Sequence, residues 1–333
     1  MKIREKVGRL LMMGLSGPDL DPESRDLLLE IRPGGIILFK RNTGGGPGQI
    51  ATLVADCQNS ARDHFQRRLF TAIDQEGGPV RRLGPPFTQL PSQREMSRLT
   101  VDQARALGET SGRELASVGL NFNLAPVMDV NTDPSAAFMA ERSFGPDPDQ
   151  AAHYGAALIE GHAARGVLTC LKHFPGIGDV KVDPHHDLPT VDHPEERLRR
   201  VELVPFVRAV GRGAPAVMSA HVNFPALDPD WPGTFSHKIM TGILRMELGF
   251  SGLVLTDDLE MGAVVKNFQI GPAAVRAVRA GCDLLLVCSR PDLIVAARDA
   301  LVEALETGEI TPDRLEQSLD RADGALALIG AGA

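Results

Sequence analysis

Eight short apolar runs, separated by longer helical patterns, constrain the fold of this 333-residue chain more than any other feature. The runs are continuous rather than alternating, which is typical of parallel strands that are buried on both faces. Eight strand–helix units favour a closed barrel over an open sheet. The sequence therefore predicts an α/β fold, a single (β/α)8 TIM-type barrel that forms one domain over residues 1–333. The predicted strands are Leu10–Leu15, Gly35–Phe39, Leu69–Ile73, Phe122–Val130, Val167–Lys172, Ala216–Ala220, Leu253–Thr256 and Leu284–Cys288.

The segments between the strands carry helix signals. Ser236 is placed to cap a helix that runs to about Leu248, with Gly249 beyond it as a stop. Amphipathic or capped helices are also predicted at Gln49–His64, Asp102–Val118, Gln150–Arg165, Pro291–Thr307 and Pro312–Leu328.

Composition and charge exclude several classes of protein. The net charge is −8 and no Lys/Arg block stands out, so we expect no nucleic-acid partner. No apolar run approaches the length of a membrane span, and the apolar stretch near the start is too short for a secretory signal. The four cysteines form no metal-ligand pattern and suit buried thiols in a reducing compartment. We therefore expect a cytoplasmic protein with no cofactor and no metal.

Polar side chains that end the predicted strands are the candidates for chemistry, because barrel enzymes build their sites at that edge. Asp257 follows the seventh run, on a rigid strand end from which a carboxylate reaches the mouth of the barrel. Its neighbour Asp258 should point elsewhere, since strand residues alternate. Asp257 is therefore the predicted nucleophile. The other polar strand ends are Asp74, Glu76, Asp129, Lys172, His173 and His221.

The long segment after the fifth run, residues 172–192, is the candidate source of a proton donor. Asp183 and His185 are spaced to form a carboxylate–imidazole pair, in which the carboxylate orients the ring. An imidazole suits a donor that must later act as a base. Two further interpretations stay open for this His- and Asp-rich segment, a metal site and a plain surface loop.

Ordered motifs along almost the whole chain resemble family 3 of the glycoside hydrolases, in particular the single-domain bacterial β-N-acetylglucosaminidases of cell-wall recycling. The resemblance implies that the barrel is the N-terminal type of domain of that family. The motifs are GGIILFKRN (34–42), AIDQEGGPVRRL (72–83), LAPVMDV (124–130), ERSFG (141–145), KHFPGIGD (172–179), the DPH loop (183–185), MSAHV (218–222), LRMELGFSGLVLTDDLEMGA (244–263) and AGCDLLLVC (280–288).

The resemblance implies roles for individual residues. It makes Asp257 the covalent nucleophile of a retaining mechanism, and His185 the general acid/base on a mobile loop, paired with Asp183. It also implies a sugar-binding set that consists of Asp74, Arg82, Arg142, Lys172 and His173. The simpler structural interpretations are rim salt bridges for the two arginines and interior polar groups for the lysine and the histidine.

One position departs from the family pattern. The family loop usually reads KHFPGHGD, and Ile177 stands here in place of the second histidine. We expect that histidine to support the loop, so its loss bears on loop conformation rather than on the dyad itself. His186 is the candidate to substitute for it in space.

The predicted function is a retaining exo-β-N-acetylglucosaminidase that acts on a small carbohydrate or muropeptide substrate, in particular 1,6-anhydro-muropeptides of cell-wall recycling. Three different functions stay open beside it. One is a phosphorylase on the same barrel, one is an aldolase that uses Lys172 as a Schiff-base lysine, and one is a non-catalytic sugar-binding barrel.

Overall fold

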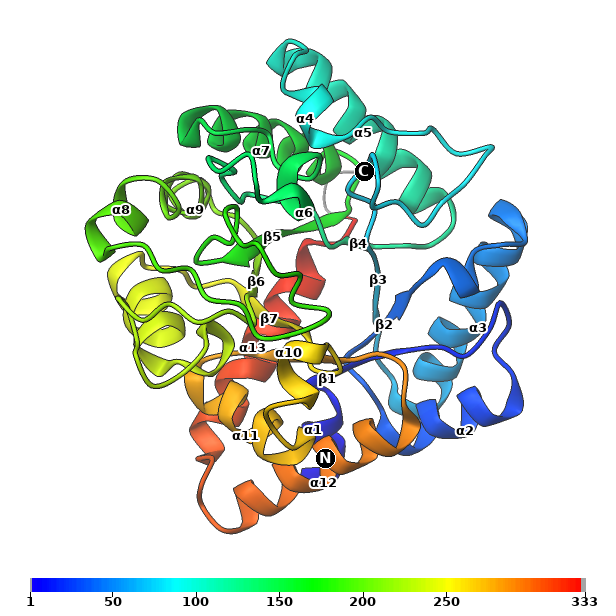
Figure 1. The fold of residues 1–333 in the computed structure, drawn as a ribbon. Helices are drawn as coiled ribbons and strands as arrows, with labels where there is room; N and C mark the ends of the chain where they lie inside the picture. Colours follow the sequence, from blue (N-terminus) through cyan, green and yellow to red (C-terminus); the bar gives the residue numbers. More distant parts are fainter. Residues whose placement is uncertain (1, 331–333) are drawn as a thin grey trace.

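A computed structural model describes residues 2–330, in which eight parallel strands close into a barrel in sequence order (Figure 1). The predicted (β/α)8 barrel is confirmed. Residues 1 and 331–333 of the predicted domain lie outside the described residues. The strands are β1 (Leu11–Gly14), β2 (Gly35–Leu38), β3 (Phe70–Ile73), β4 (Phe122–Asn123), β5 (Leu168–Phe174), β6 (Ala216–Ser219), β7 (Leu253–Asp258) and β8 (Leu284–Val287).

The strand side chains alternate between the barrel interior and the helices outside it. Met12 and Ile37 belong to the interior cluster, whereas their neighbours Met13 and Ile36 pack into the outer core. Phe70 and Phe122 fill the interior with ring centroids 5.4 Å apart. The barrel is therefore a packed core, and only its rim is available for a site.

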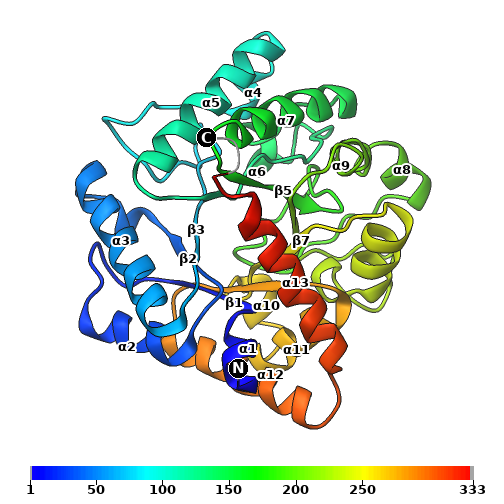
Figure 2. The same ribbon diagram turned by 180° about the vertical axis from the view of Figure 1, so that it is seen from behind.

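Helices surround the barrel and one of them covers its base. The last helix, α13, crosses in front of the barrel in the view from the rear (Figure 2), and its Ala322 and Ala325 join the interior cluster. The base is therefore covered, which leaves the opposite rim as the open end. The helices are α1 (Ile3–Gly8), α2 (Pro22–Ile31), η1 (Lys40–Asn42), α3 (Gly46–Phe65), α4 (Gln93–Met96), α5 (Val101–Ser117), α6 (Ala137–Ala140), α7 (Pro148–Ala163), α8 (Glu195–Arg200), α9 (Val204–Val210), η2 (Gly233–Phe235), η3 (Lys238–Glu247), α10 (Gly262–Val265), α11 (Ile270–Ala280), α12 (Pro291–Glu306) and α13 (Pro312–Leu328).

Two predicted elements differ from the structure. The fourth strand is predicted over Phe122–Val130, but the continuous strand covers only Phe122–Asn123. Pro126, which has no N–H to donate, interrupts the segment, and an isolated bridge between Val127 and Lys172 follows it. The helix predicted after Ser236 is a π-helix, Lys238–Glu247. The Ser236 hydroxyl still accepts the Ile239 N–H at 3.0 Å, so the predicted cap is confirmed.

Two further expectations concern apolar segments and thiols. Within residues 2–330, none of the helices combines the length and the apolar character needed to cross a bilayer. The four cysteines are free and buried, as predicted.

Candidate active site

The carboxyl ends of the strands bring most of the predicted residues to one rim. Asp74 follows β3, Lys172 and His173 lie in β5, and Asp257 lies near the end of β7. The long segment after β5 crosses this rim towards α10 (Figure 1). The parallel barrel therefore gathers side chains that are far apart in the sequence.

A chain of ion pairs runs along one side of the rim. Lys172 Nζ lies 2.8 Å from Asp74 Oδ1 and 2.7 Å from Glu76 Oε1. Arg142 donates two hydrogen bonds to the Glu76 carboxylate, at 2.9 and 2.8 Å. Arg82 Nη2 lies 3.3 Å from Asp74 Oδ2. Two carboxylates and three cations therefore alternate along this side of the rim.

This network fixes the charge of its members. Burial disfavours ionisation of Glu76, but Arg142 and Lys172 hold the pKa of that carboxyl well below its usual range. Burial likewise opposes the charge of Lys172, yet Asp74 and Glu76 raise the pKa of its ammonium group. Lys172 is therefore protonated near neutral pH and suited to donating hydrogen bonds.

His173 is oriented by a buried carboxylate. Its Nδ1 lies 2.7 Å from Asp129 Oδ2, and its Nε2 lies 3.4 Å from Arg142 Nη2. The Asp129 carboxylate also accepts the backbone N–H groups of His173 and Ile177, at 3.2 and 2.8 Å. Asp129 therefore links the imidazole to the first residues of the long loop.

Asp257 is held as an anion. Burial would raise its pKa, but His173, His221, His185 and Lys172 together lower it. The Asp258 N–H donates to Asp257 Oδ1 at 2.8 Å, which fixes one oxygen. An ionised, oriented carboxylate at a strand end is competent as a nucleophile.

The side chain of Asp258 occupies a different environment from that of Asp257. Its Oδ1 accepts the Glu260 N–H at 3.0 Å. Burial raises the pKa of Asp258 to about 7.

His221 Nε2 lies 3.2 Å from the Asp258 carbonyl oxygen and its Nδ1 lies 2.8 Å from Thr234 Oγ1, so both ring nitrogens are engaged. His221 is thus a packed, hydrogen-bonded support for the end of β7.

The predicted dyad is formed on the loop. His185 Nδ1 lies 2.7 Å from Asp183 Oδ1, and the His185 N–H donates to the same oxygen at 2.9 Å. With Nδ1 engaged, Nε2 is the nitrogen left for proton transfer. The His185 side chain is 59% exposed, so an incoming group has access to it.

The loop is docked onto the segment that follows Asp257. Gly262 and Ala263 donate their N–H groups to the carbonyls of His185 and Pro184, at 3.1 and 3.0 Å. The ring of Phe138 meets the His185 ring edge-on, with centroids 6.3 Å apart. These contacts place the dyad beside the segment that follows β7, with the His185 ring still exposed to solvent.

Three residues that contribute to the site have no role that sequence reasoning assigns. Glu76 lies inside a motif and Asp129 ends a predicted strand, but neither position by itself indicates a partner. Both still carry a detectable signal, because an acidic residue just after a buried barrel strand faces the rim. The third residue, Phe138, lies in α6 and carries no comparable signal.

Comparison with known proteins gives a family match over nearly the whole chain. The model described as "Glycosyl hydrolase family 3 N terminal domain" matches residues 2–323. A β-hexosaminidase of Alkalilimnicola ehrlichii is 38% identical over 295 residues, which is 86% of this chain and 82% of that protein. β-Hexosaminidase A of Pseudoalteromonas piscicida is 34% identical over 326 residues, or 91% of this chain.

Solved structures give the same picture. A family 3 β-N-acetylglucosaminidase from Paenibacillus sp. superposes with a TM-score of 0.96 at 40% identity, covering 98% of this chain. A β-N-acetylhexosaminidase from Beutenbergia cavernae gives 0.89 at 30% identity and covers 98% of both chains. The chain spans about half (54%) of the P. piscicida protein and 62% of the Paenibacillus chain.

Proposed function

The chain belongs to glycosyl hydrolase family 3, and from that membership and its similarity to β-hexosaminidases we propose that it is a retaining exo-β-N-acetylglucosaminidase. Asp257 is the proposed nucleophile, and His185 with Asp183 is the proposed acid/base dyad. Residues 1–333 are proposed to form one catalytic domain.

The observation that carries this proposal is the pairing of two groups at one rim. Asp257 is an ionised carboxylate on β7, and the loop with the Asp183–His185 pair is hydrogen-bonded to Gly262 and Ala263 directly after that strand. A fixed anion and a proton carrier on opposite sides of a bound sugar are what glycoside hydrolysis with retention requires.

In the first step an Asp257 carboxylate oxygen attacks the anomeric carbon and the bond to the leaving oxygen breaks. His185 Nε2 gives its proton to that oxygen, while the Nδ1–H of the same ring keeps its hydrogen bond to Asp183. In the second step water attacks the glycosyl–enzyme ester and gives its proton to His185 Nε2. Asp257 leaves as a carboxylate, so both groups return to their starting states.

The substrate is proposed to lie against the ionic network. Asp74 and Arg82 are partly accessible and have spare hydrogen-bonding capacity for sugar hydroxyls. Lys172, His173 and Arg142 line the same side and present charged or polar donors. Because Glu76 and Asp129 hold these groups in place, the donors meet the sugar already oriented.

We propose a muropeptide as the natural substrate, with N-acetylglucosamine released from 1,6-anhydro-muramic acid products in a cytoplasmic cell-wall recycling step. This finer statement rests on the resemblance of the motifs to the single-domain recycling enzymes. Comparing turnover of purified 1,6-anhydro-muropeptides with that of chitobiose tests it, and a clear preference for chitobiose would reject it.

The test of the mechanism uses aryl β-N-acetylglucosaminides of graded leaving-group acidity. Asp257→Ala should lose nearly all activity on every substrate. His185→Ala should lose activity on poor leaving groups and retain far more on a dinitrophenyl leaving group, which needs no protonation. Equal loss on all leaving groups would rule out the acid role of His185. The exposed His64→Ala variant is the matched control.

A phosphorylase remains the second candidate because the proposed acid/base is an imidazole rather than a carboxylate. A neutral or cationic ring repels phosphate less than an anionic acid does. Assays with inorganic phosphate separate the two, since sugar 1-phosphate would form in place of free sugar.

The charges at the rim disfavour both an aldolase and a non-catalytic barrel. A Schiff-base aldolase needs a neutral amine, whereas Lys172 lies between two carboxylates that raise its pKa. Absence of borohydride trapping would complete that exclusion. A non-catalytic sugar-binding barrel would need neither an ionised nucleophile at Asp257 nor a proton carrier such as the Asp183–His185 pair.

A further inference from the structure

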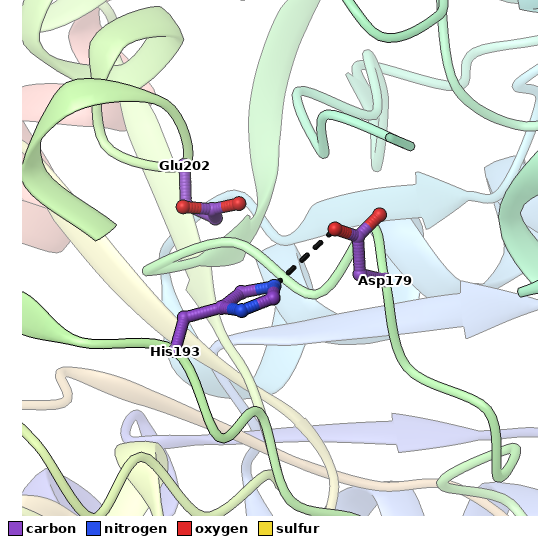
Figure 3. Close-up of side chains that lie close together, drawn as sticks. All are labelled: Asp179, His193 and Glu202. Carbon is purple, nitrogen blue, oxygen red and sulfur yellow. Dashed lines mark hydrogen bonds and ion pairs between the residues drawn. The ribbon is translucent and has the colours of Figure 1, made fainter. Parts of the chain in front are cut away.

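A second cluster of titratable side chains lies at the base of the catalytic loop, apart from the proposed active site. It consists of Asp179, His193 and Glu202, and one polar atom from each lies within 4.8 Å of the other two (Figure 3). His193 Nε2 is 3.3 Å from Asp179 Oδ2.

The cluster ties together the two ends of the loop. Asp179 stands just before the segment that carries Asp183 and His185, and His193 stands just after it. Glu202 comes from the turn before α9 and packs against Gly176, where an added Cβ would meet the Glu202 Cβ at 2.8 Å. A group that bound all three side chains would therefore join both stems of the loop to the barrel wall.

Glu202 has an unused acceptor at this point. Its side chain is 2% exposed, and its Oε2 is buried without a hydrogen-bond partner among residues 2–330. The carboxylate faces the gap between Asp179 and His193 (Figure 3). A buried carboxylate oxygen without a donor is costly, so a partner that the protein does not itself supply is expected there.

Arg197 is the present counter-ion of the cluster. Its Nη2 lies 2.8 Å from Glu202 Oε1 and 3.4 Å from Asp179 Oδ2, and it donates to Thr132 Oγ1 at 2.9 Å. Its side chain is 27% exposed, and its own Nε is buried without a partner among the described residues. The guanidinium therefore pairs through Nη2, leaves its Nε–H unpaired within residues 2–330, and has a route to solvent.

We propose that Asp179, His193 and Glu202 bind a divalent transition-metal ion of the zinc class, with Arg197 displaced towards solvent. Imidazole nitrogen and carboxylate oxygen are both ligands of Zn²⁺, and the imidazole disfavours Mg²⁺ and Ca²⁺. Ligand atoms of a tetrahedral zinc site lie about 3.4 Å apart. The present spread of up to 4.8 Å therefore closes with shifts of about 1 Å.

Such an ion would act on the loop rather than on the sugar. It would clamp the two stems and restrict the movement of the Asp183–His185 pair. We therefore expect turnover by the wild type to change with bound metal, and this response to be lost when the cluster is disabled.

Calorimetric titration of the chelator-treated enzyme with Zn²⁺ tests the proposal. We expect one ion per chain with a dissociation constant below about 10 µM, and Co²⁺ should give the visible absorption of a tetrahedral N/O site. His193→Ala and Glu202→Gln should each weaken binding at least tenfold, with circular dichroism verifying the fold. Arg197→Met should tighten binding, because it removes the competing cation.

The competing location is the catalytic dyad, which also pairs a histidine with an aspartate. His185→Ala should therefore keep wild-type zinc affinity, as should His64→Ala, an exposed histidine on α3. Binding lost in His185→Ala but kept in His193→Ala would overturn the assignment. So would weaker binding by Arg197→Met, or no binding tighter than about 100 µM in the wild type. None of these readouts depends on the proposed hydrolase activity.

Discussion

Glu76 is the residue whose removal best tests how the substrate-binding side of the rim is built. Its carboxylate is buried and bonds both Arg142 and Lys172. Glu76→Gln leaves Arg142 without a carboxylate at its Nε and Nη2, whereas Lys172 keeps Asp74 at 2.8 Å. Breaking one partner of a buried ion pair typically costs about 3–5 kcal/mol. Because glutamine keeps one acceptor oxygen, we expect the lower end, a loss of about 3 kcal/mol.

Urea unfolding followed by circular dichroism measures this loss. Glu316→Gln is the matched control, since that carboxylate pairs with Lys6 at the surface and is half exposed. A surface pair is worth about 0–1 kcal/mol. Adding Arg142→Met to Glu76→Gln should restore part of the stability, because it removes the stranded charge. A loss in Glu76→Gln no larger than that in Glu316→Gln would refute the claim that a buried network preorganises the site.

Three further predictions concern loop docking, a titrating carboxyl and the thiols. A Cβ on Gly262 would lie 2.6 Å from the His185 carbonyl oxygen, so Gly262→Ala should displace the loop and lower kcat about 10- to 100-fold. Gly324→Ala is the control, since an added Cβ there meets no atom within 4 Å and kcat should not change. Equal kcat values for the two variants would contradict the docking of the loop. The raised pKa of Asp258 means that the folded state holds its proton more tightly than the unfolded state does. Stability should therefore fall as pH rises from 3.8 to about 7, and Asp258→Asn should remove up to about 4 kcal/mol of that fall in urea titrations at several pH values. A thiol reagent should label none of the four buried cysteines in the native enzyme and all four in urea, and rapid native labelling would contradict their burial.

The fold could be predicted because its signal is local. Each buried parallel strand is a continuous apolar run, and the runs around Ile37 and Leu285 need no knowledge of their partners to be recognised. Asp257 could be predicted in the same way, since a charged residue after such a run has to reach the rim. The predicted strand boundaries were least accurate for the fourth strand, because Pro126 has no N–H to donate and interrupts the apolar run.

The supporting residues could not be predicted because their meaning depends on distant partners. Glu76 bonds Arg142 across 66 positions, and Asp129 bonds His173 across 44. Neither pair has a fixed spacing or a periodic pattern, and only closure of the barrel brings the partners together. The π-helix after Ser236 escapes prediction for a different reason, since its sequence is amphipathic and differs from an α-helix only in backbone geometry.

Ile177, the departure from the family pattern, acquires a physical interpretation from these contacts. Its N–H donates to Asp129, and its side chain is 2% exposed within the apolar core. The backbone at this position is thus held by the carboxylate that also orients His173, whatever side chain stands there. His186 is exposed and therefore does not fill the buried space beside it. The histidine at the base of the loop is instead His193, which contacts Asp179. The Asp129 carboxylate therefore holds the start of the loop, and the His193 imidazole, rather than one at position 177, holds its end.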